Sequence, residues 1–128
     1  MKFLIHLTWL LLLFTGLCSA QSIAEQQDAR VIENLVAAGS DISKPHNIDF
    51  FMLLPSKAKA KAAATEIEQL GYTIASVDRP PGQSQWQIHA TRVMAPQLEA
   101  MTATTRALEA VAAKHGGDYD GWGTGVVE

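Results

Sequence analysis

A run of seven residues between two prolines constrains the fold of this chain more than any other segment. Residues 48–54 read Ile-Asp-Phe-Phe-Met-Leu-Leu, after Pro45 and before Pro55. Successive side chains of a strand point to opposite faces of its sheet, and from Phe50 onward both faces are apolar. A strand that is buried on both sides, in the middle of a sheet, gives this pattern. The sequence therefore predicts a central strand over residues 48–54.

Three segments carry helical signals. Apolar spacing predicts a first helix over residues 23–38, ended by Gly39, with a polar first half that is expected to fray. Ser56 is a favourable N-cap for the alanine-rich segment 57–70, which Gly71 ends. Pro96 suits the first turn of a last helix, which stops at Gly116-Gly117. The predicted core stripe of this last helix is Leu98, Met101, Thr105, Leu108 and Ala112.

The remaining segments predict strands. Residues 72–77 and 85–91 are expected to pair as a hairpin across the turn at 79–84, and a final strand is predicted over 123–127, after an Asp120-Gly121 turn. The order after the first helix is strand-helix-strand-strand-helix-strand. This order predicts an α+β domain with the ferredoxin-like split β-α-β fold, in which two helices cover one face of an antiparallel sheet. The extra N-terminal helix is left to dock on an edge, an end or the open face.

The first twenty residues predict a signal peptide rather than part of the domain. Met1-Lys2 gives a basic start, residues 3–17 are almost wholly apolar, and Cys18-Ser19-Ala20 offers small residues where a signal peptidase cuts. The apolar run is shorter than the ~20 residues of a membrane-spanning helix. We therefore expect a signal peptide over 1–20, a single domain over 21–128, and a protein that is periplasmic or secreted.

Two alternatives remain for this leader. The apolar run can be retained as a membrane anchor. A lipoprotein signal also ends at a cysteine, which would make Cys18 a lipidation site and the chain a membrane-anchored lipoprotein, although Leu17 is not the small residue that such signals prefer. In either case the membrane would be a partner only through this leader.

The charge balance bears on the partner. Residues 21–128 hold 9 basic and 13 acidic side chains, a net charge of −4. This acidic balance disfavours direct binding of nucleic acid, whose phosphates require basic residues. Cys18 is the one cysteine of the chain, so the domain is expected to hold together by its core, without disulfides.

No constellation of residues points to catalysis, a metal or a cofactor. His46 and Asp49 form the nearest candidate for an acid-base pair, but a loop hydrogen bond for His46 and a capping or paired role for Asp49 fit better. His89 falls on the polar face of its strand and is expected to face solvent, and His115 falls in a last helical turn. The histidines lack metal-binding spacing. We therefore predict a protein that is not an enzyme and that needs no cofactor.

A protein-binding surface is the best functional use of the remaining residues. Trp86, Tyr119 and Trp122 are of the types that anchor protein interfaces, and Arg92 and Asp120 are placed to pair near the strand ends. The alternative for the three aromatic residues is core packing over the small alanines.

The chain also resembles the family of the regulator of ribonuclease activity B, the ribonuclease E inhibitor domain. Tyr119-Asp120-Gly121-Trp122-Gly123 after Gly116-Gly117 is similar to the terminal signature of that family. The weaker similarities are Gly39-Ser40-Asp41, Asp49-Phe50-Phe51, Gly71-Tyr72 and Thr91-Arg92-Val93-Met94. The resemblance implies a ferredoxin-like domain without catalytic residues, which binds ribonuclease E and alters its activity.

Three functional hypotheses follow. The first is a non-enzymatic, protein-binding regulatory domain, exported and acting on an unknown partner in the cell envelope. The second is a cytoplasmic or membrane-tethered inhibitor of ribonuclease E. The third is a small enzyme that uses His46 and Asp49.

Overall fold

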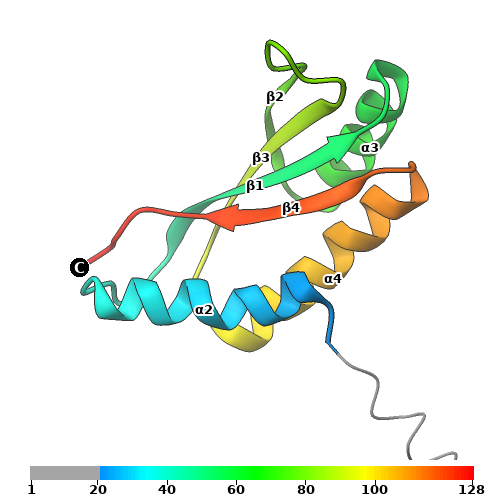
Figure 1. The fold of residues 1–128 in the computed structure, drawn as a ribbon. Helices are drawn as coiled ribbons and strands as arrows, with labels where there is room; N and C mark the ends of the chain where they lie inside the picture. The colour runs from blue at the N-terminus through cyan, green and yellow to red at the C-terminus, as the bar shows by residue number, and fades with distance from the viewer. Residues whose placement is uncertain (1–20) are drawn as a thin grey trace, which may run out of the picture.

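The computed structural model describes residues 21–128 (Figure 1). The predicted signal peptide and Cys18 lie outside the described residues. The described elements, in chain order, are α2 (Ile23–Ala37), β1 (His46–Leu54), α3 (Lys57–Gln69), β2 (Thr73–Asp78), β3 (Trp86–Met94), α4 (Leu98–Lys114) and β4 (Asp118–Gly123).

The four strands form one antiparallel sheet in the order β2-β3-β1-β4. Helices α3 and α4 follow β1 and β3 and lie together on one side of the sheet (Figure 1). This order, with β1 central and paired to both β3 and β4, is that of the ferredoxin-like split β-α-β fold. The predicted fold class and the central position of the 48–54 strand are therefore confirmed.

Helix α2 is the addition to this fold. It runs alongside β4 and packs on α4 and β4 (Figure 1). Helix α2 contacts the same face of the sheet as α3 and α4. Trp122 of β4 lies opposite the fully buried Phe50, and the indole of Trp122 donates to Asp28 of α2. The helical layer thus contains α3, α4 and α2, and α2 lies at the β4 edge.

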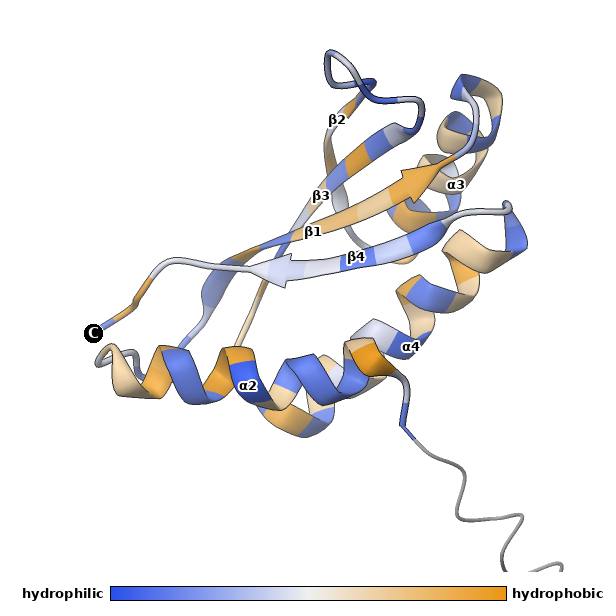
Figure 2. Ribbon diagram, in the orientation of Figure 1, coloured by the Kyte–Doolittle hydropathy of each residue, from blue (hydrophilic) through white to orange (hydrophobic). Residues whose placement is uncertain are grey.

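The core lies between the sheet and these helices. Figure 2 shows β1 as the most hydrophobic strand. Small alanines of α3 and α4 let the helices lie close to the sheet. The fully buried members of the core are Ile48, Phe50, Met52, Leu54, Ala60, Ala63, Ile67, Ile88, Ala90, Met101 and Leu108.

The second face of β1 corrects one prediction. Phe51 and Leu53 are only partly buried, so the strand is not enclosed on both sides. The reason is that the three described helices all lie on the opposite face, which leaves this face of the sheet open in the described part of the chain. The apolar residues at these positions indicate a surface rather than a second core layer.

The position of the last strand differs from the prediction. The closing strand is β4 itself, at Asp118–Gly123, whereas the predicted strand at 123–127 and the predicted Asp120-Gly121 turn are wrong. The sheet register shifts opposite Phe51 and Met52, and the extra residue of this β-bulge is Asp120. Gly121 follows it with φ +107°, a value that favours glycine.

Residues beyond β4 are held by the loop that precedes β1. The carbonyl oxygen of Val127 accepts a hydrogen bond from the backbone of Asp41 at 2.7 Å, and the backbone N–H of Val127 donates to Ser40 Oγ at 3.0 Å. Irregular backbone therefore replaces the predicted β-branched strand.

The start of α2 is ordered by a capping box, so the predicted fraying of its first half is wrong. Ser22 Oγ accepts from the backbone N–H of Glu25, and the Glu25 carboxylate accepts from the backbone N–H of Ser22, both at 3.1 Å. Glu25 and Asp28 are also buried. These two residues make polar contacts with α4 and β4 instead of facing solvent.

The start of α4 differs slightly from the prediction. The helix begins at Leu98 with Gln97 as its N-cap, so Pro96 precedes the helix instead of forming its first turn. Leu98 is about half exposed and does not join the core. The other four predicted stripe residues are buried.

Gly71 ends α3 in a backbone conformation that favours glycine. Its φ is +101°, and an added Cβ would meet no atom within 4 Å. We expect Gly71→Val to lower the free energy of unfolding by about 1 kcal/mol, because only backbone strain opposes it. Urea titration of the two chains measures this difference. A difference of zero would show that the residue at this helix end has no conformational constraint.

Candidate functional site

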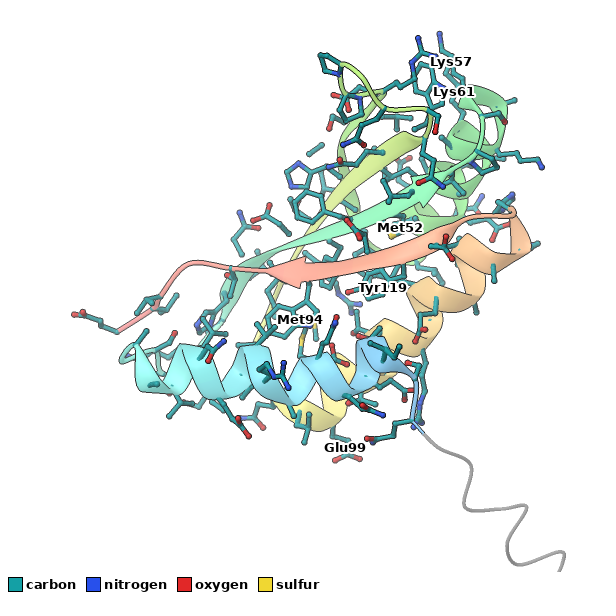
Figure 3. All side chains as sticks on the ribbon, in the orientation of Figure 1. Met52, Lys57, Lys61, Met94, Glu99 and Tyr119 are labelled. Atoms are coloured by element: carbon teal, nitrogen blue, oxygen red, sulfur yellow. The ribbon has the colours of Figure 1, made fainter. Side chains whose placement is uncertain are left out.

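The structure distributes the five predicted binding residues over different parts of the molecule. Trp86 lies at the start of β3, partly buried opposite Leu54, with the Nζ of Lys57 5.7 Å from its ring centroid. Figure 3 shows Lys57 beside Lys61 at the end of the molecule where α3 begins. Arg92 lies near the opposite end of β3.

Arg92 is exposed and contacts Tyr72 rather than Asp120. Its guanidinium carbon lies 5.0 Å from the Tyr72 ring centroid, and its Nη1 donates to the Tyr72 hydroxyl at 3.3 Å. Strand β1 separates β3 from β4, and the ion pairs among residues 21–128 do not join Arg92 to Asp120. The predicted Arg92–Asp120 pairing is therefore wrong.

Tyr119 and Trp122 both point from β4 toward the helices. Figure 3 shows Tyr119 between β4 and the helical layer. Trp122 is 9% exposed and belongs to the core, and Tyr119 packs against that core from its margin. Burial raises the pKa of the Tyr119 hydroxyl far above its usual range. Trp122 therefore packs in the core, which was the alternative given for the aromatic residues. A direct binding role for the five residues stays a prediction.

A cavity of about 110 Å³ lies between α2 and the edge strand β4. We call it the α2–β4 cavity. Helix α2 contributes one wall and the bulged part of β4 contributes the other. Its lining residues are Ala24, Gln27, Asp28, Val31, Asp120, Gly121 and Trp122.

Asp28 is the buried polar group of this cavity. Its side chain is 1% exposed. One carboxylate oxygen, Oδ1, accepts from Trp122 Nε1 at 2.8 Å and from Thr105 Oγ1 at 2.9 Å. The other oxygen, Oδ2, is buried and has no hydrogen-bond partner among the described residues. Native proteins satisfy most buried polar atoms, so this oxygen requires an explanation.

The surroundings of Asp28 are acidic. Burial is the largest cause that raises its pKa, and the nearby carboxylates of Glu25 and Glu109 raise the pKa further, against the hydrogen bonds from Trp122 and Thr105. Glu25 itself has a lowered pKa, chiefly because the backbone N–H of Ser22 donates to it and next because Arg106 pairs with it. Arg106 is thus engaged by Glu25, and no ion pair joins Asp28 to a basic residue within residues 21–128.

This burial predicts a pH-dependent stability. A carboxyl group whose pKa is raised by folding destabilises the folded state as pH rises, because ionisation is easier in the unfolded chain. We expect Asp28→Asn to gain stability over the native chain as pH rises from the ordinary value of 3.8, with the difference levelling off above the raised pKa. Asparagine retains an acceptor for Trp122 and Thr105.

Urea titrations of both chains across this pH range measure the difference. Asp118→Asn, at an exposed position of β4, is the control for removal of one negative charge. If the difference in free energy of unfolding between the native and Asp28→Asn chains stays constant with pH, the raised pKa of Asp28 is contradicted.

The open face of the sheet carries a second group of side chains that contact one another. Phe51 of β1 stacks on His89 of β3, with ring centroids 4.9 Å apart and planes 17° apart. His89 Nε2 donates to Asp49 Oδ1 at 2.6 Å. On the β4 side Phe51 lies opposite Gly121, which has no side chain to cover it. His89 is therefore paired and stacked, which corrects the prediction that it only faces solvent.

The His46–Asp49 pair considered for catalysis does not form, since Asp49 pairs with His89 from the neighbouring strand. His46 is 1% exposed, its Nδ1 donates to the Lys44 carbonyl at 2.7 Å, and its Nε2 lies 2.6 Å from the Ser40 hydroxyl. The loop hydrogen-bonding role of His46 and the paired role of Asp49 are confirmed. The groups needed for an acid-base dyad are therefore engaged elsewhere.

Sequence reasoning missed Asp28 and Phe51. Asp28 stood in a polar stretch that was expected to fray, and its burial depends on a contact with Trp122, 94 residues later. Phe51 carried a signal, because its apolar alternation was visible, but it was assigned to a buried face. Within residues 21–128, no group of three or more ionisable side chains is placed to hold a metal ion. The helices of that same part of the chain are all too short or too polar to cross a membrane.

Comparison with known proteins finds a family match over the described domain. Residues 25–124 match the family described as Regulator of ribonuclease activity B. A relative of that name from Actinobacillus succinogenes is 26% identical over 103 residues, which cover 78% of this chain and 72% of the relative. The family match covers the described elements from α2 to β4, except the first two residues of α2. The chain therefore belongs to the regulator of ribonuclease activity B family.

Proposed function

We propose that this protein is a non-enzymatic regulator that alters the activity of a ribonuclease by binding it. The observation that carries the proposal is the family match, which extends over the complete sheet, α3, α4 and nearly all of α2. The name of the relative from Actinobacillus succinogenes supports it. The resemblance of the terminal segment 119–123 to the ribonuclease E inhibitor signature makes ribonuclease E the first partner to test.

Two surfaces are available for such a contact. The open sheet face presents Phe51 between His89 and Gly121, and the β4 edge presents the α2–β4 cavity with Asp120 at its exposed bulge. Both are formed by residues of well-separated segments, so the folded domain and not a linear motif would be recognised. The net charge of −4 over residues 21–128 favours contact with a basic protein segment over contact with RNA.

The direct experiment measures binding of the purified protein to ribonuclease E by calorimetry, together with cleavage of a defined RNA by that enzyme. We expect a complex and a reduced cleavage rate. An RNA-only control should show no complex. If ribonuclease E neither binds nor changes its rate, the proposed partner is wrong.

A second candidate function follows from the apolar run at residues 3–17. It is export to the periplasm or beyond, with a protein of the cell envelope as partner, and it includes membrane anchoring by a lipid on Cys18. Alkaline phosphatase fused after Glu128 is active only outside the cytoplasm and therefore separates this candidate from ribonuclease regulation inside the cell. Sequencing the mature N-terminus, with a lipid assay at Cys18, distinguishes cleavage from lipidation.

A further inference from the structure

We propose that the α2–β4 cavity receives a lysine or arginine side chain of the protein partner. The inference rests on the proposed function only in taking a protein as the ligand. It assigns the cavity as the recognition site and a cation as the group recognised.

The first argument is the unpartnered oxygen of Asp28. Its Oδ2 is buried and has no hydrogen-bond partner within residues 21–128, whereas its Oδ1 already accepts two hydrogen bonds. A carboxylate oxygen only accepts hydrogen bonds, so the missing partner is a donor. Because an ammonium or guanidinium donates and also carries positive charge, it satisfies the oxygen and neutralises the buried charge together.

The second argument is the charge around the cavity. Asp28 and Asp120 are in its lining, and Glu25 and Glu109 act on Asp28 from α2 and α4. The basic group that packs nearby, Arg106, is paired with Glu25. Negative charge therefore exceeds positive charge here, which attracts a cation and repels an anion.

The third argument is the shape of the cavity. Its volume of about 110 Å³ is several times the roughly 10–15 Å³ that one water molecule requires. Ala24, Val31 and Trp122 give it apolar walls beside the two carboxylates. Lysine and arginine have an aliphatic stem that packs on apolar walls and a charged end that needs polar partners, so they fit both parts of the lining.

The position of the cavity gives a partner access. Strand β4 is at the edge of the sheet, and its outer side has no strand neighbour among the described residues. The bulge places Asp120 in the cavity lining while its side chain stays exposed. A partner segment that approaches this edge can therefore insert one side chain between α2 and β4, with Asp120 as its first contact.

The test uses two synthetic peptides as probes. Acetyl-Thr-Val-Lys-Val-Thr-amide carries the cation, and the same peptide with norleucine in place of lysine keeps the stem and loses the charge. An arginine peptide distinguishes the two cations. Binding is followed through the indole N–H signal of Trp122 in two-dimensional NMR, since this group donates to Asp28. We expect the lysine or arginine peptide to bind about tenfold or more tightly than the norleucine peptide, as a charge-assisted hydrogen bond requires.

Matched variants locate the effect. Asp28→Asn keeps an acceptor for Trp122 and Thr105, so it should fold and lose the preference for the cationic peptide. Asp118→Asn removes one negative charge from an exposed position of β4 and should keep the preference. Val31→Phe should fill the cavity and abolish binding of all three peptides, with the far-ultraviolet circular dichroism spectrum showing that the fold is intact.

The outcomes separate this inference from the proposed function. Equal binding of the three peptides, an unmoved Trp122 signal, or an unchanged preference in Asp28→Asn would overturn the cavity assignment, even if ribonuclease E binds. A cation preference that depends on Asp28 supports the assignment, even if ribonuclease E does not bind and the partner is another protein. Tighter binding of a single-stranded RNA than of either cationic peptide would also contradict it.

Discussion

Replacing Trp122 with alanine is expected to lower the free energy of unfolding by about 3–5 kcal/mol, the usual cost of truncating a large buried aromatic residue. The indole is 9% exposed and lies opposite Phe50, so its removal leaves a void where β4 meets the core. It also removes the Nε1 donor of Asp28, which leaves a buried carboxylate with one donor fewer. Both losses act on the same edge of the sheet.

Urea unfolding followed by circular dichroism measures the difference. Trp86→Ala is the matched control, because Trp86 is only partly buried at the start of β3 and its replacement should cost clearly less. Equal costs for the two variants would show that Trp122 does not belong to the core. If the costs differ, the effects of the two substitutions on partner binding can be compared only after the difference in stability is taken into account.

Replacing Gly117 with alanine is expected to cost about 3 kcal/mol, at the upper end for overpacking a well-packed core. An added Cβ would clash with the backbone oxygen of Leu53 and lie 2.6 Å from Leu54 Cδ1. A backbone atom of the central strand cannot move aside as a flexible side chain does. The connection from α4 to β4 would therefore shift away from β1.

Thermal and urea unfolding of Gly117→Ala measure this cost. The control is Gly123→Ala, where the added Cβ meets no atom within 4 Å and which we expect to be near neutral. A cost below that of Gly71→Val would contradict the close approach of residue 117 to β1, since Gly71 has only backbone strain to oppose substitution.

The periodicity of apolar residues was sufficient to predict most of the fold. The apolar run at 48–54 predicted the central position of β1, although its second face is open, and Ser56 and Gly71 bounded α3 within one residue. These signals are local, because capping and left-handed glycine conformations depend on a few neighbouring residues. The order of these helices and strands along the chain then predicted the ferredoxin-like fold.

The errors arose where distant contacts decide the structure. The Asp120-Gly121 pair has the composition of a turn, but pairing of β4 with β1 on both sides of it makes it a bulge. The ion pair of Asp49 with His89 depends on the register between β1 and β3. The buried state of Asp28 depends on docking of α2. No local pattern contains this information.

The docking of α2 has a consequence for the dynamics of the domain. Among the described elements α2 packs only on α4 and β4. It adds Ile32 and Leu35 to the core, and its contact also includes a polar network around Asp28. Strand β1, in contrast, is paired on both sides and lies at the centre of the sheet. Such a peripheral helix opens at a lower free energy than the elements beneath it. Amide hydrogens of α2 should therefore exchange with deuterium before those of β1, so that local opening of the domain begins at this helix.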